Sequence, residues 1–428
     1  MIRTIVITLF LAVAALAARA QEPFKERIFA VTTQDEYAAG SDLWFSLATL
    51  DADCRPLAMS RVAAVELFSD TRMLRVRVAL TDGRGRGYIR LPETLAPGRD
   101  TLMAYTRYMQ NEGEAHYFSK PNDIIGRGAA VRESAICSRA ADSLAFRRFC
   151  AEAKPIEQLA HDYRPEVDGE VIVGRFVPDE GYAGGVRMPN LSISGNEIHY
   201  YPGTPLTRSG QTPDGDLVEF VTPVLTGQTT LYTGCKRGGH VELLGPYRPD
   251  SRPSSLRGKA DGAAGEDYLT GDGVAAPLPH GRGSEVEPEG LLGLHLYTPL
   301  RSYDLDQWRR FDTFKEMFLE FMPSVTTVSS DEGERVALYD YSSERFNDGN
   351  TLVLLDGVAV TVHEDLLRYD PHMVKYVDLY HGTYFFGHEH YTAIFSCTTH
   401  SGDLPRYDLP DNTCVNHYDA VQQLEVKE

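Results

Sequence analysis

The residues of this sequence with the most evident chemical potential are histidines near the C-terminus. Six of them lie between positions 363 and 400: His363, His372, His381, His388, His390 and His400. Because His388 and His390 are two residues apart, they would share one face of a strand. With His381 or His400 across a hairpin, they would offer three nitrogen ligands suited to zinc or copper. Gly387 before them instead favours an exposed turn with solvated histidines, so we expect neither a bound metal nor a cofactor.

The sequence lacks the common catalytic motifs. The metalloprotease motif HExxH is missing, because His363-Glu364 is followed by Asp365-Leu366-Leu367-Arg368. No GxSxG motif of serine hydrolases occurs. Gly281-Arg282-Gly283 neither follows a predicted strand nor opens a helix, as a phosphate-binding loop would. We therefore expect no catalytic residues and no enzyme activity.

A run of aromatic residues lies among the same histidines: Tyr376, Tyr380, Tyr384, Phe385, Phe386 and Tyr391. On a strand, Tyr384 and Phe386 would share one face and Phe385 would lie on the other. Exposed aromatic side chains anchor many protein interfaces, whereas aromatic pairs inside a sheet only stabilise it. Tyr384, Phe386 and Tyr391 are the expected partner contacts.

The elements that would position these side chains belong to a chain predicted to be exported. Arg3, the apolar segment 5–18 and the small residues of Ala18-Arg19-Ala20 are typical of a secretory signal peptide, residues 1–20. No later segment approaches the roughly 18 apolar residues of a membrane-spanning helix. We expect no transmembrane segment after signal cleavage, and a protein of the periplasm or the outer-membrane surface.

Charge and cysteine content limit the chemistry further. The chain has 42 Lys and Arg against 61 Asp and Glu, a net charge of −19, and loss of Arg3 and Arg19 makes it −21. Such an acidic chain is a poor candidate for nucleic-acid binding. Its six cysteines allow fifteen disulfide connectivities, among which the sequence does not choose. A continuous helix would hold Cys137 and Cys150 roughly 20 Å apart, so they would pair only if that helix breaks.

Residues 26–125 are predicted to form a β-sandwich. Short β-prone segments alternate with turns such as Asp82-Gly83 and Pro97-Gly98: Ile28–Thr32, Asp42–Ala48, Val62–Phe68, Leu74–Leu80, Gly87–Leu91 and Asp100–Tyr108. Thr33-Gln34-Asp35-Glu36-Tyr37, Leu43-Trp44-Phe45 and the later turns resemble, in their order, a macroglobulin-like domain of the α2-macroglobulin family. Some members carry a Cys-Gly-Glu-Gln thioester, but here Cys235 precedes Lys236-Arg237-Gly238. The resemblance therefore implies the fold and not protease trapping.

The middle of the chain divides into three predicted segments. Residues 131–163 have helical composition, with a rough apolar stripe, and are expected to form a helical linker: Ile136, Ala140, Leu144 and Phe149. Residues 167–248 resemble, in their rhythm of strands and turns, a second immunoglobulin-like or carboxypeptidase-regulatory-like β-sandwich. Residues 251–290 are 30% glycine and proline, which predicts a flexible linker.

The last part contains two strong local signals. Thr313 and Glu316 form a capping box before an apolar helical stripe of Phe314, Met317, Phe318 and Phe321, which Pro323 ends. Asp356-Gly357 joins two apolar runs and predicts a tight β-hairpin.

Residues 306–428 resemble the plug domain of TonB-dependent outer-membrane receptors. The resemblance rests on the order of Leu352–Val358, a short helix through Leu366-Leu367, Val374–Leu379 and Phe386-Gly387. Plugs usually have small residues where this chain has His388-Glu389-His390-Tyr391. A receptor barrel needs many strands of roughly ten residues, and 26 residues follow Gly402. We therefore expect a plug-like domain without a transport channel.

The predicted fold is mainly β and multidomain, with two β-sandwich domains, a flexible linker and a C-terminal α+β plug-like domain. The predicted function is a non-enzymatic envelope protein with an outer-membrane-associated adhesion or assembly role. Its plug-like domain would dock an envelope or outer-membrane protein by edge-strand addition or aromatic contact. A carbohydrate- or metal-binding surface module is the alternative. Oligomeric state and disulfide connectivity stay open.

Overall fold

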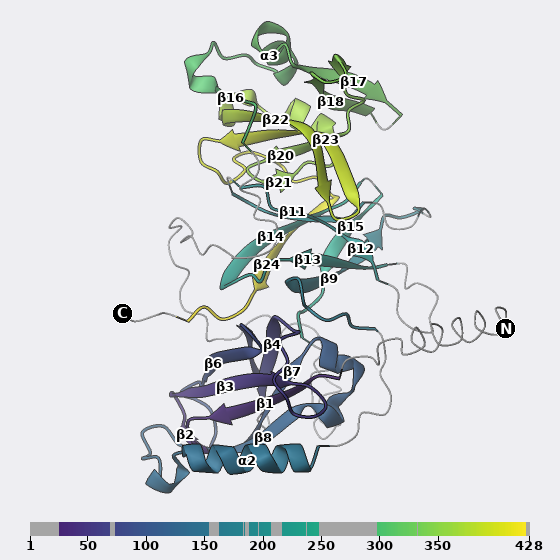
Figure 1. Cartoon of the computed structure of the whole chain (residues 1–428). Helices are drawn as coiled ribbons and strands as arrows, with labels where there is room; N and C mark the ends of the chain where they lie inside the picture. The colour runs from purple at the N-terminus through teal and green to yellow at the C-terminus, as the bar shows by residue number, and fades with distance from the viewer. Residues whose placement is uncertain are drawn as a thin grey trace, which may run out of the picture. The chain divides into compact units, whose positions relative to one another are not determined.

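The structure is a computed structural model that describes residues 25–68, 73–153, 162–182, 184, 188–195, 197–206, 216–236, 238–247, 298–331 and 333–424. The expected signal peptide and the expected linker at 251–290 lie outside these residues. The described chain divides into two units, one up to Val167 and one from Asp168 onward. Both consist mainly of β-strands, which confirms the predicted mainly β, multidomain fold (Figure 1). No described helix is long and apolar enough to cross a membrane.

The first unit is a sandwich of a three-stranded sheet, β1-β3-β6, and a five-stranded sheet, β2-β8-β7-β4-β5. The strands are β1 (Arg27–Thr32), β2 (Glu36–Ala38), β3 (Asp42–Leu50), β4 (Val62–Phe68), β5 (Met73–Ala79), β6 (Arg84–Arg90), β7 (Gly98–Thr106) and β8 (Phe118–Ile125). The sequence pattern did not predict β8, because Pro121 and polar neighbours interrupt its alternation. Pro121 lies opposite Thr101 of β7, but Asp123 N–H donates to the carbonyl oxygen of Asp35, so the nitrogens at positions 121 and 123 face the β2 side. Because β2 pairs with β8 only from Asp123 onward, the missing N–H of Pro121 is tolerated.

Helix α2 (Arg139–Ala151) is docked on the first sandwich. Phe146 and Phe149 lie with ring centroids 5.2 and 5.3 Å from Phe29 of β1. The predicted apolar stripe is partly wrong, because Ile136 and Leu144 are 61% and 60% exposed. The described part of the expected helical linker therefore packs on its own domain. Three short 3₁₀ turns precede it in the chain: η1 (Tyr108–Asn111), η2 (Glu114–His116) and η3 (Glu133–Ala135).

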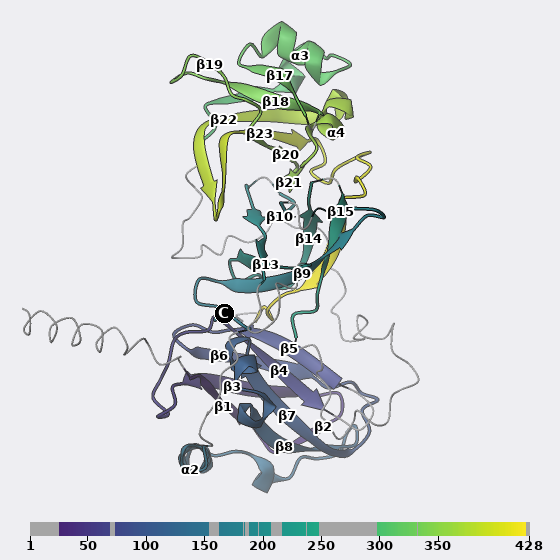
Figure 2. The same cartoon turned by 90° about the vertical axis from the view of Figure 1, so that its right-hand side faces the viewer.

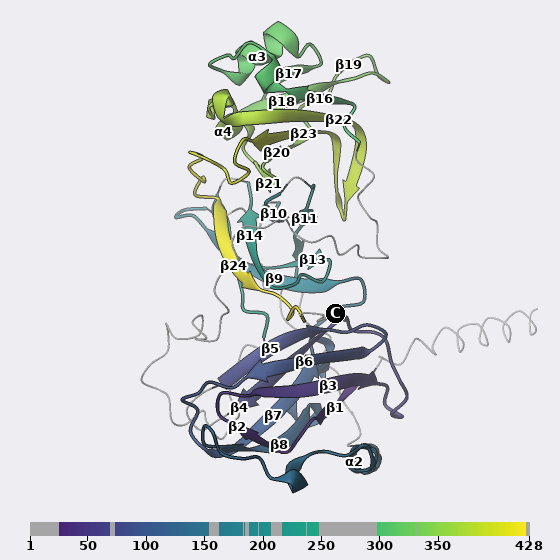
Figure 3. The same ribbon diagram turned by 90° about the vertical axis from the view of Figure 1, so that its left-hand side faces the viewer.

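The second unit contains a second sandwich, with sheets β12-β13-β9-β15 and β11-β10-β14-β24. Its strands are β9 (Glu170–Pro178), β10 (Asn190–Ile193), β11 (Tyr200–Pro202), β12 (Thr204–Pro205), β13 (Leu217–Thr222), β14 (Gln228–Gly234), β15 (Gly239–Leu243) and β24 (Thr413–Asp419). β24 comes from the end of the chain and pairs with all of β14 (Figure 3). The expected boundaries, 167–248 and 306–428, therefore need correction, because Thr413–Asp419 completes the second sandwich.

The part from β16 to β23, here called the C-terminal domain, has the expected α+β composition. A mixed sheet, β16-β22-β23-β20-β21, packs beside a smaller sheet, β17-β18-β19. Only β20 and β23 pair in parallel among the strands described there. The elements are β16 (Arg301–Asp304), η5 (Leu305–Gln307), α3 (Phe314–Phe321), β17 (Val325–Ser330), β18 (Gly333–Asp340), β19 (Arg345–Phe346), β20 (Thr351–Leu355), β21 (Val358–Ala359), α4 (His363–Arg368), η6 (Pro371–Met373), β22 (Val374–Phe386) and β23 (Glu389–Thr399).

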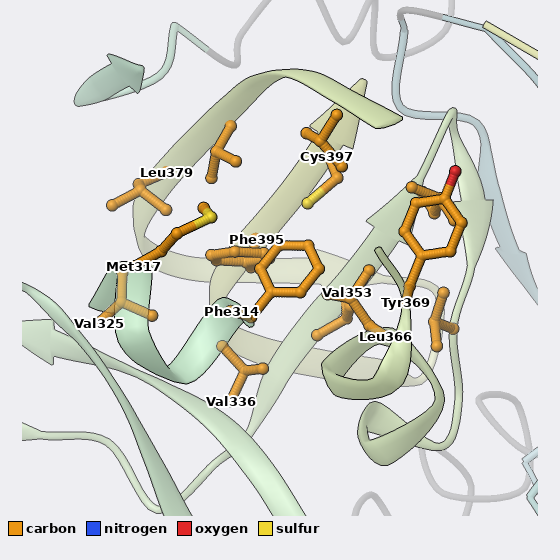
Figure 4. Close-up of a cluster of buried hydrophobic side chains, with 14 of the residues drawn as sticks. Phe314, Met317, Val325, Val336, Val353, Leu366, Tyr369, Leu379, Phe395 and Cys397 are labelled. Carbon is orange, nitrogen blue, oxygen red and sulfur yellow. The ribbon is translucent and has the colours of Figure 1, made fainter. Parts of the chain in front are cut away.

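Helix α3 closes the main core of this domain. Thr313 accepts a hydrogen bond from the backbone N–H of Glu316 at 3.2 Å, which confirms the predicted N-terminus. Phe314 and Met317 are buried, and the ring of Phe314 lies 6.4 Å from that of Phe395 on β23 (Figure 4). The helical stripe seen in the sequence is therefore the face that covers the sheet.

The Asp356-Gly357 turn joins β20 to β21, as predicted. Both residues have positive φ, 47° and 80°, which a two-residue hairpin of this type requires. Asp356 is fully buried and accepts hydrogen bonds from the backbone N–H groups of Thr399 and Leu404 at 2.7 and 2.8 Å. The side chain of Asp356 therefore holds the segment that leaves β23.

Candidate interaction surface

The histidines singled out by the sequence do not converge. His381 lies 2.8 Å from the carbonyl oxygen of Tyr339, and His400 lies 3.2 Å from a carboxylate oxygen of Asp306. His388 and His390 are exposed near the tip of the β22–β23 hairpin. Within the described ranges, no three His, Cys, Asp or Glu side chains are arranged to hold a metal ion. The four candidate ligands thus form no common site in the described chain.

The expected contact residues lie mostly on the buried face of the β22–β23 hairpin. Phe386 and Tyr391 are 5% and 7% exposed, and Tyr384 is half-buried. Tyr200 of β11 covers them, with ring centroids 5.3 Å from Phe386 and 5.8 Å from Tyr391. The exposed aromatic ring of this hairpin is Phe385, at 73%. The alternation was predicted, but the solvent-facing side was assigned wrongly, because the covering strand is far away in the sequence.

Tyr200, Phe386 and Tyr391, here called the inner aromatic cluster, surround a buried carboxylate. Glu389 accepts hydrogen bonds from the hydroxyl groups of Tyr200 at 2.7 Å and Tyr391 at 2.9 Å. Burial raises the pKa of Tyr200 well above its usual value, and the charge of Glu389 adds to this effect. Both phenols therefore stay protonated and act as donors to the carboxylate.

The inner aromatic cluster belongs to a core shared by the second sandwich and the C-terminal domain. Its buried members come from both parts: Ile198, Tyr200, Leu352, Leu354, Ala359, Tyr380, Phe386, Tyr391 and Ile394. Ala359 N–H donates to Ser192 Oγ at 3.2 Å, and Gly195 N–H donates to the carbonyl oxygen of Asp356 at 2.9 Å. The hairpin also reaches β10 and β11 in Figures 2 and 3. The C-terminal domain is therefore packed against the second sandwich rather than tethered to it.

Exposed aromatic residues gather instead around η5 and α3. Trp308 is 47% exposed and stacks on Phe321, with ring centroids 4.8 Å apart and an interplanar angle of 9°. Tyr303 lies 6.4 Å from Trp308, and Phe311 lies 5.9 Å from Phe321. One face of the Trp308 ring is thus occupied by Phe321, while much of the residue stays open to solvent.

Local hydrogen bonds hold Trp308 in place. Asp304 accepts from the backbone N–H of Asp306 at 3.1 Å and from the side chain of Gln307 at 2.9 Å, which fixes the η5 turn. Arg310 donates to the carbonyl oxygen of Val374 at 2.8 Å and so ties the following segment to β22. Hydrogen bonds therefore hold the chain both before Trp308, at η5, and after it, at Arg310.

A second exposed aromatic group lies at the β18–β19 turn. Tyr341 and Phe346 are 49% and 36% exposed, with ring centroids 5.2 and 5.3 Å from Tyr339. Asp340 accepts hydrogen bonds from Ser342 N–H at 2.9 Å and from its hydroxyl group at 2.6 Å. Together with the Ser343 hydroxyl group, these bonds lower the pKa of Asp340 to about 2, so the carboxylate that holds the turn stays ionised.

Arg301 on β16 connects the two exposed groups. The neighbouring Tyr303 and Tyr341 side chains raise the pKa of its guanidinium. We call the combined group, in which Tyr303 is buried, the outer aromatic band: Tyr303, Trp308, Phe311, Phe321, Tyr339, Tyr341 and Phe346. β16 is also an edge strand, which pairs with β22 on one side and with no other described strand. An edge strand flanked by aromatic rings is an arrangement that can receive an extended peptide.

The sequence reasoning missed this surface, although a signal was present. Trp308 stands in Asp306-Gln307-Trp308-Arg309-Arg310, and Tyr341 stands in Asp340-Tyr341-Ser342-Ser343. An aromatic residue in a polar stretch has no apolar neighbours in sequence that would bury it. This pattern favours exposure more strongly than the alternating pattern of Tyr384, Phe386 and Tyr391 does.

Comparisons with known proteins find partial structural likenesses. No family model and no curated protein matches the chain. The chain is similar to a β-glucosidase from Listeria innocua in complex with glucose, with a TM-score of 0.19 and 12% identity over 24% of this chain and 16% of the other. For native Escherichia coli α2-macroglobulin the TM-score is 0.20, with 11% identity over 53% of this chain and 14% of the other.

The chain is also similar to FdeC, an Escherichia coli adhesin. The TM-score is 0.20 and the identity 11%, over 52% of this chain and 65% of the adhesin chain. The present chain thus spans only 14–16% of the glucosidase and macroglobulin chains that it matches. These partial likenesses assign the chain to no family.

Proposed function

We propose that the protein is a non-enzymatic, exported envelope component that docks another protein through its outer aromatic band. The observation that carries the proposal is the exposure of Trp308 and Tyr341 beside the edge strand β16. Aromatic side chains bury much area at low entropic cost and often dominate binding energy. The unpaired backbone groups of an edge strand add hydrogen bonds to an incoming strand. The occupant would be an extended segment of the partner.

The charges around the band indicate the chemistry of that segment. Arg301 and Arg309 are both exposed, and the guanidinium of Arg309 lies 5.7 Å from the ring centroid of Phe311. These positive groups stand out on a chain with a net charge of −19. A segment with an acidic residue beside an apolar or aromatic one would complement them, and the charges would mainly favour orientation and association rate.

The location and the partner class rest on the sequence patterns. The signal-peptide pattern supports export to the periplasm or the outer-membrane surface. The resemblance of residues 306–428 to a receptor plug supports an envelope or outer-membrane protein as the partner. In this proposal the β-sandwich domains position the C-terminal domain, which performs an adhesion or assembly role.

A carbohydrate ligand is the second candidate, and Trp308 is the observation that favours it. The C–H face of a sugar ring can stack on an exposed indole, and sugar hydroxyl groups can bond to nearby polar side chains. The exposed side chains of Asp306 and Gln307 lie beside Trp308 in the chain. We place this function second because a sugar ring stacked on Trp308 does not explain the exposure of Tyr341 and Phe346, which belong to the same band.

Site-specific photo-crosslinking tests the proposal. The full chain would carry p-benzoylphenylalanine at Phe346, at the rim of the band, and would be irradiated with an envelope extract of the producing bacterium. Leu144, which is 60% exposed on α2 in the first unit, provides a matched exposed apolar control position. We expect a discrete protein adduct from position 346 that excess unlabelled wild-type chain prevents, and no such adduct from position 144.

The outcomes separate the candidates. If periodate oxidation removes the mass shift of the adduct, the result would favour the carbohydrate function. Equal, uncompeted labelling from positions 346 and 144 would contradict docking through the band.

A further inference from the structure

Cys54 sits in a short, well-fixed loop at the end of β3. The Asp51 carboxylate accepts hydrogen bonds from the backbone N–H groups of Asp53 at 2.9 Å and Arg55 at 2.8 Å. The backbone N–H of Asp51 donates to the carbonyl oxygen of Arg55 at 2.8 Å, which closes the loop. Cys54 itself has a φ of 60°, a conformation unfavourable for a residue other than glycine. The fold thus holds a cysteine where glycine would be less strained.

Cys150 lies in the last turn of α2, opposite this loop. Its neighbour Phe149 packs on Phe29 of β1, with ring centroids 5.3 Å apart. At the start of β1, Arg27 pairs with Leu50, the last residue before the Cys54 loop. Arg27 also acts electrostatically on the Cys150 thiol. The register of β1 with β3 therefore brings the end of α2 to the loop.

The two thiol groups meet at this point. The side chains of Cys54 and Cys150 are neighbours here, and the Cys54 thiol acts on the Cys150 thiol. Burial, followed by this interaction with Cys54, raises the pKa of Cys150 to about 12. Neither residue is fully buried, so an oxidant can reach the pair. Cys235, by contrast, is buried and donates to the carbonyl oxygen of Gly239 at 2.9 Å.

We propose that Cys54 and Cys150 form a disulfide that fastens α2 to the first sandwich. The thiolate of one cysteine attacks the disulfide of an oxidant, such as oxidised glutathione or a dithiol oxidase, and releases one thiol. The thiolate of the other cysteine then attacks the resulting mixed disulfide and releases the second thiol. Two cysteine thiols lose two protons and two electrons in total, and the oxidant disulfide becomes two thiols.

The bond has a structural consequence because α2 is weakly held without it. The helix has no fully buried residue, and its ring contacts with β1 come from Phe146 and Phe149. A cross-link between positions 54 and 150 closes a loop of nearly a hundred residues and strongly restricts the unfolded chain. The oxidised first unit should therefore unfold at a temperature roughly 5–10 °C above that of the reduced one.

Peptide mapping of the full chain tests the proposal. The purified protein would be equilibrated with oxidised glutathione at pH 8, alkylated, digested with trypsin and analysed by mass spectrometry. Trypsin separates the two cysteines, because Cys54 lies in peptide 28–61 and Cys150 in peptide 149–175, with Cys137 in peptide 133–139. We expect peptides 28–61 and 149–175 joined by a reducible bond, and a thermal transition that reductant lowers by several degrees.

Single variants provide the controls. Cys54→Ser and Cys150→Ser should each abolish the joined peptides and the reductant-sensitive transition, while Cys137→Ser should leave both unchanged. Far-UV circular dichroism checks that each variant is folded. Full alkylation of both cysteines after oxidation of the folded wild-type chain, or a different pairing of either one, would overturn the proposal.

Discussion

The two aromatic groups of the second unit consist of similar residues, but one lies in a buried core and the other reaches the surface. The inner aromatic cluster joins the second sandwich to the C-terminal domain, and Phe386 and Tyr391 are less than a tenth exposed. The outer aromatic band ends in Trp308 and Tyr341, each about half exposed. Aromatic content alone therefore does not identify a contact surface. What separates the groups is whether another part of the same chain covers them.

The largest expected difference concerns stability. Phe386→Ala should lower the free energy of unfolding by about 3–5 kcal/mol, because it removes a large buried side chain from a shared core. Phe385→Ala, its 73% exposed neighbour, should change stability by about 0.5 kcal/mol or less. Urea unfolding followed by fluorescence measures both. Equal losses for the two variants would contradict the assignment of inner and outer faces on this hairpin.

A pH titration tests the buried histidine that contacts β18, the strand that carries Tyr339 of the outer aromatic band. His363 accepts a hydrogen bond from Val336 N–H of β18 at 3.0 Å, and burial lowers the pKa of His363 to about 3. The unfolded chain takes up this proton near pH 6.5, whereas the folded chain keeps the ring neutral, so stability falls as the pH drops through this range. Between pH 6.5 and 4.5 the loss should be about 2 kcal/mol.

The control for the pH titration is His363→Gln, which keeps an acceptor but cannot titrate. Its stability should depend less on pH between 6.5 and 4.5 than that of the wild type. Identical pH profiles for the two proteins would show that His363 does not stay neutral in the folded chain.

Removing one tyrosine hydroxyl group from the inner cluster or from the outer band should have a smaller effect on stability. Tyr200→Phe removes a donor to the buried carboxylate of Glu389 and should cost about 1–2 kcal/mol. Tyr341→Phe removes a hydroxyl group from a half-exposed residue and should cost less than about 0.5 kcal/mol. Thermal unfolding of both variants measures the two losses of stability. A larger loss for Tyr341→Phe than for Tyr200→Phe would contradict the prediction.

Trp308→Ala should also lower stability only slightly. The stacking of Trp308 on Phe321 contributes about 0.5–1 kcal/mol, so the variant should stay folded with a slightly lower unfolding midpoint. A loss above about 2 kcal/mol, measured by urea unfolding, would mean that Trp308 is a packing residue and that the outer aromatic band is part of the core.

Local sequence signals predicted what depends on neighbouring residues. The Thr313–Glu316 capping box gave the start of α3, and Asp356-Gly357 gave the β20–β21 hairpin. The mainly β, multidomain character also followed from the regular spacing of strands and turns. The helix start and the hairpin are each determined within about ten residues of chain.

Features that depend on distant pairing were not predicted. β24 pairs with β14, nearly two hundred residues earlier, so no local pattern indicated that it lies outside the C-terminal domain. Tyr200 covers Phe386 and Tyr391 from a different domain, and this reversed the expected exposed face. The contact between Cys54 and Cys150 depends on the β1–β3 register, which no spacing in the sequence reveals.

The most direct test of the proposed function is a competition experiment on the adduct from position 346. Unlabelled wild-type chain, Phe385→Ala, and the double variant Trp308→Ala/Tyr341→Ala would each compete with the labelled chain for the envelope partner. Because interface aromatic residues often contribute 2 kcal/mol or more, the double variant should need at least about 30-fold more protein for half-inhibition than the wild type. Phe385→Ala should compete like the wild type. A double variant that competes equally well would contradict docking through the outer aromatic band.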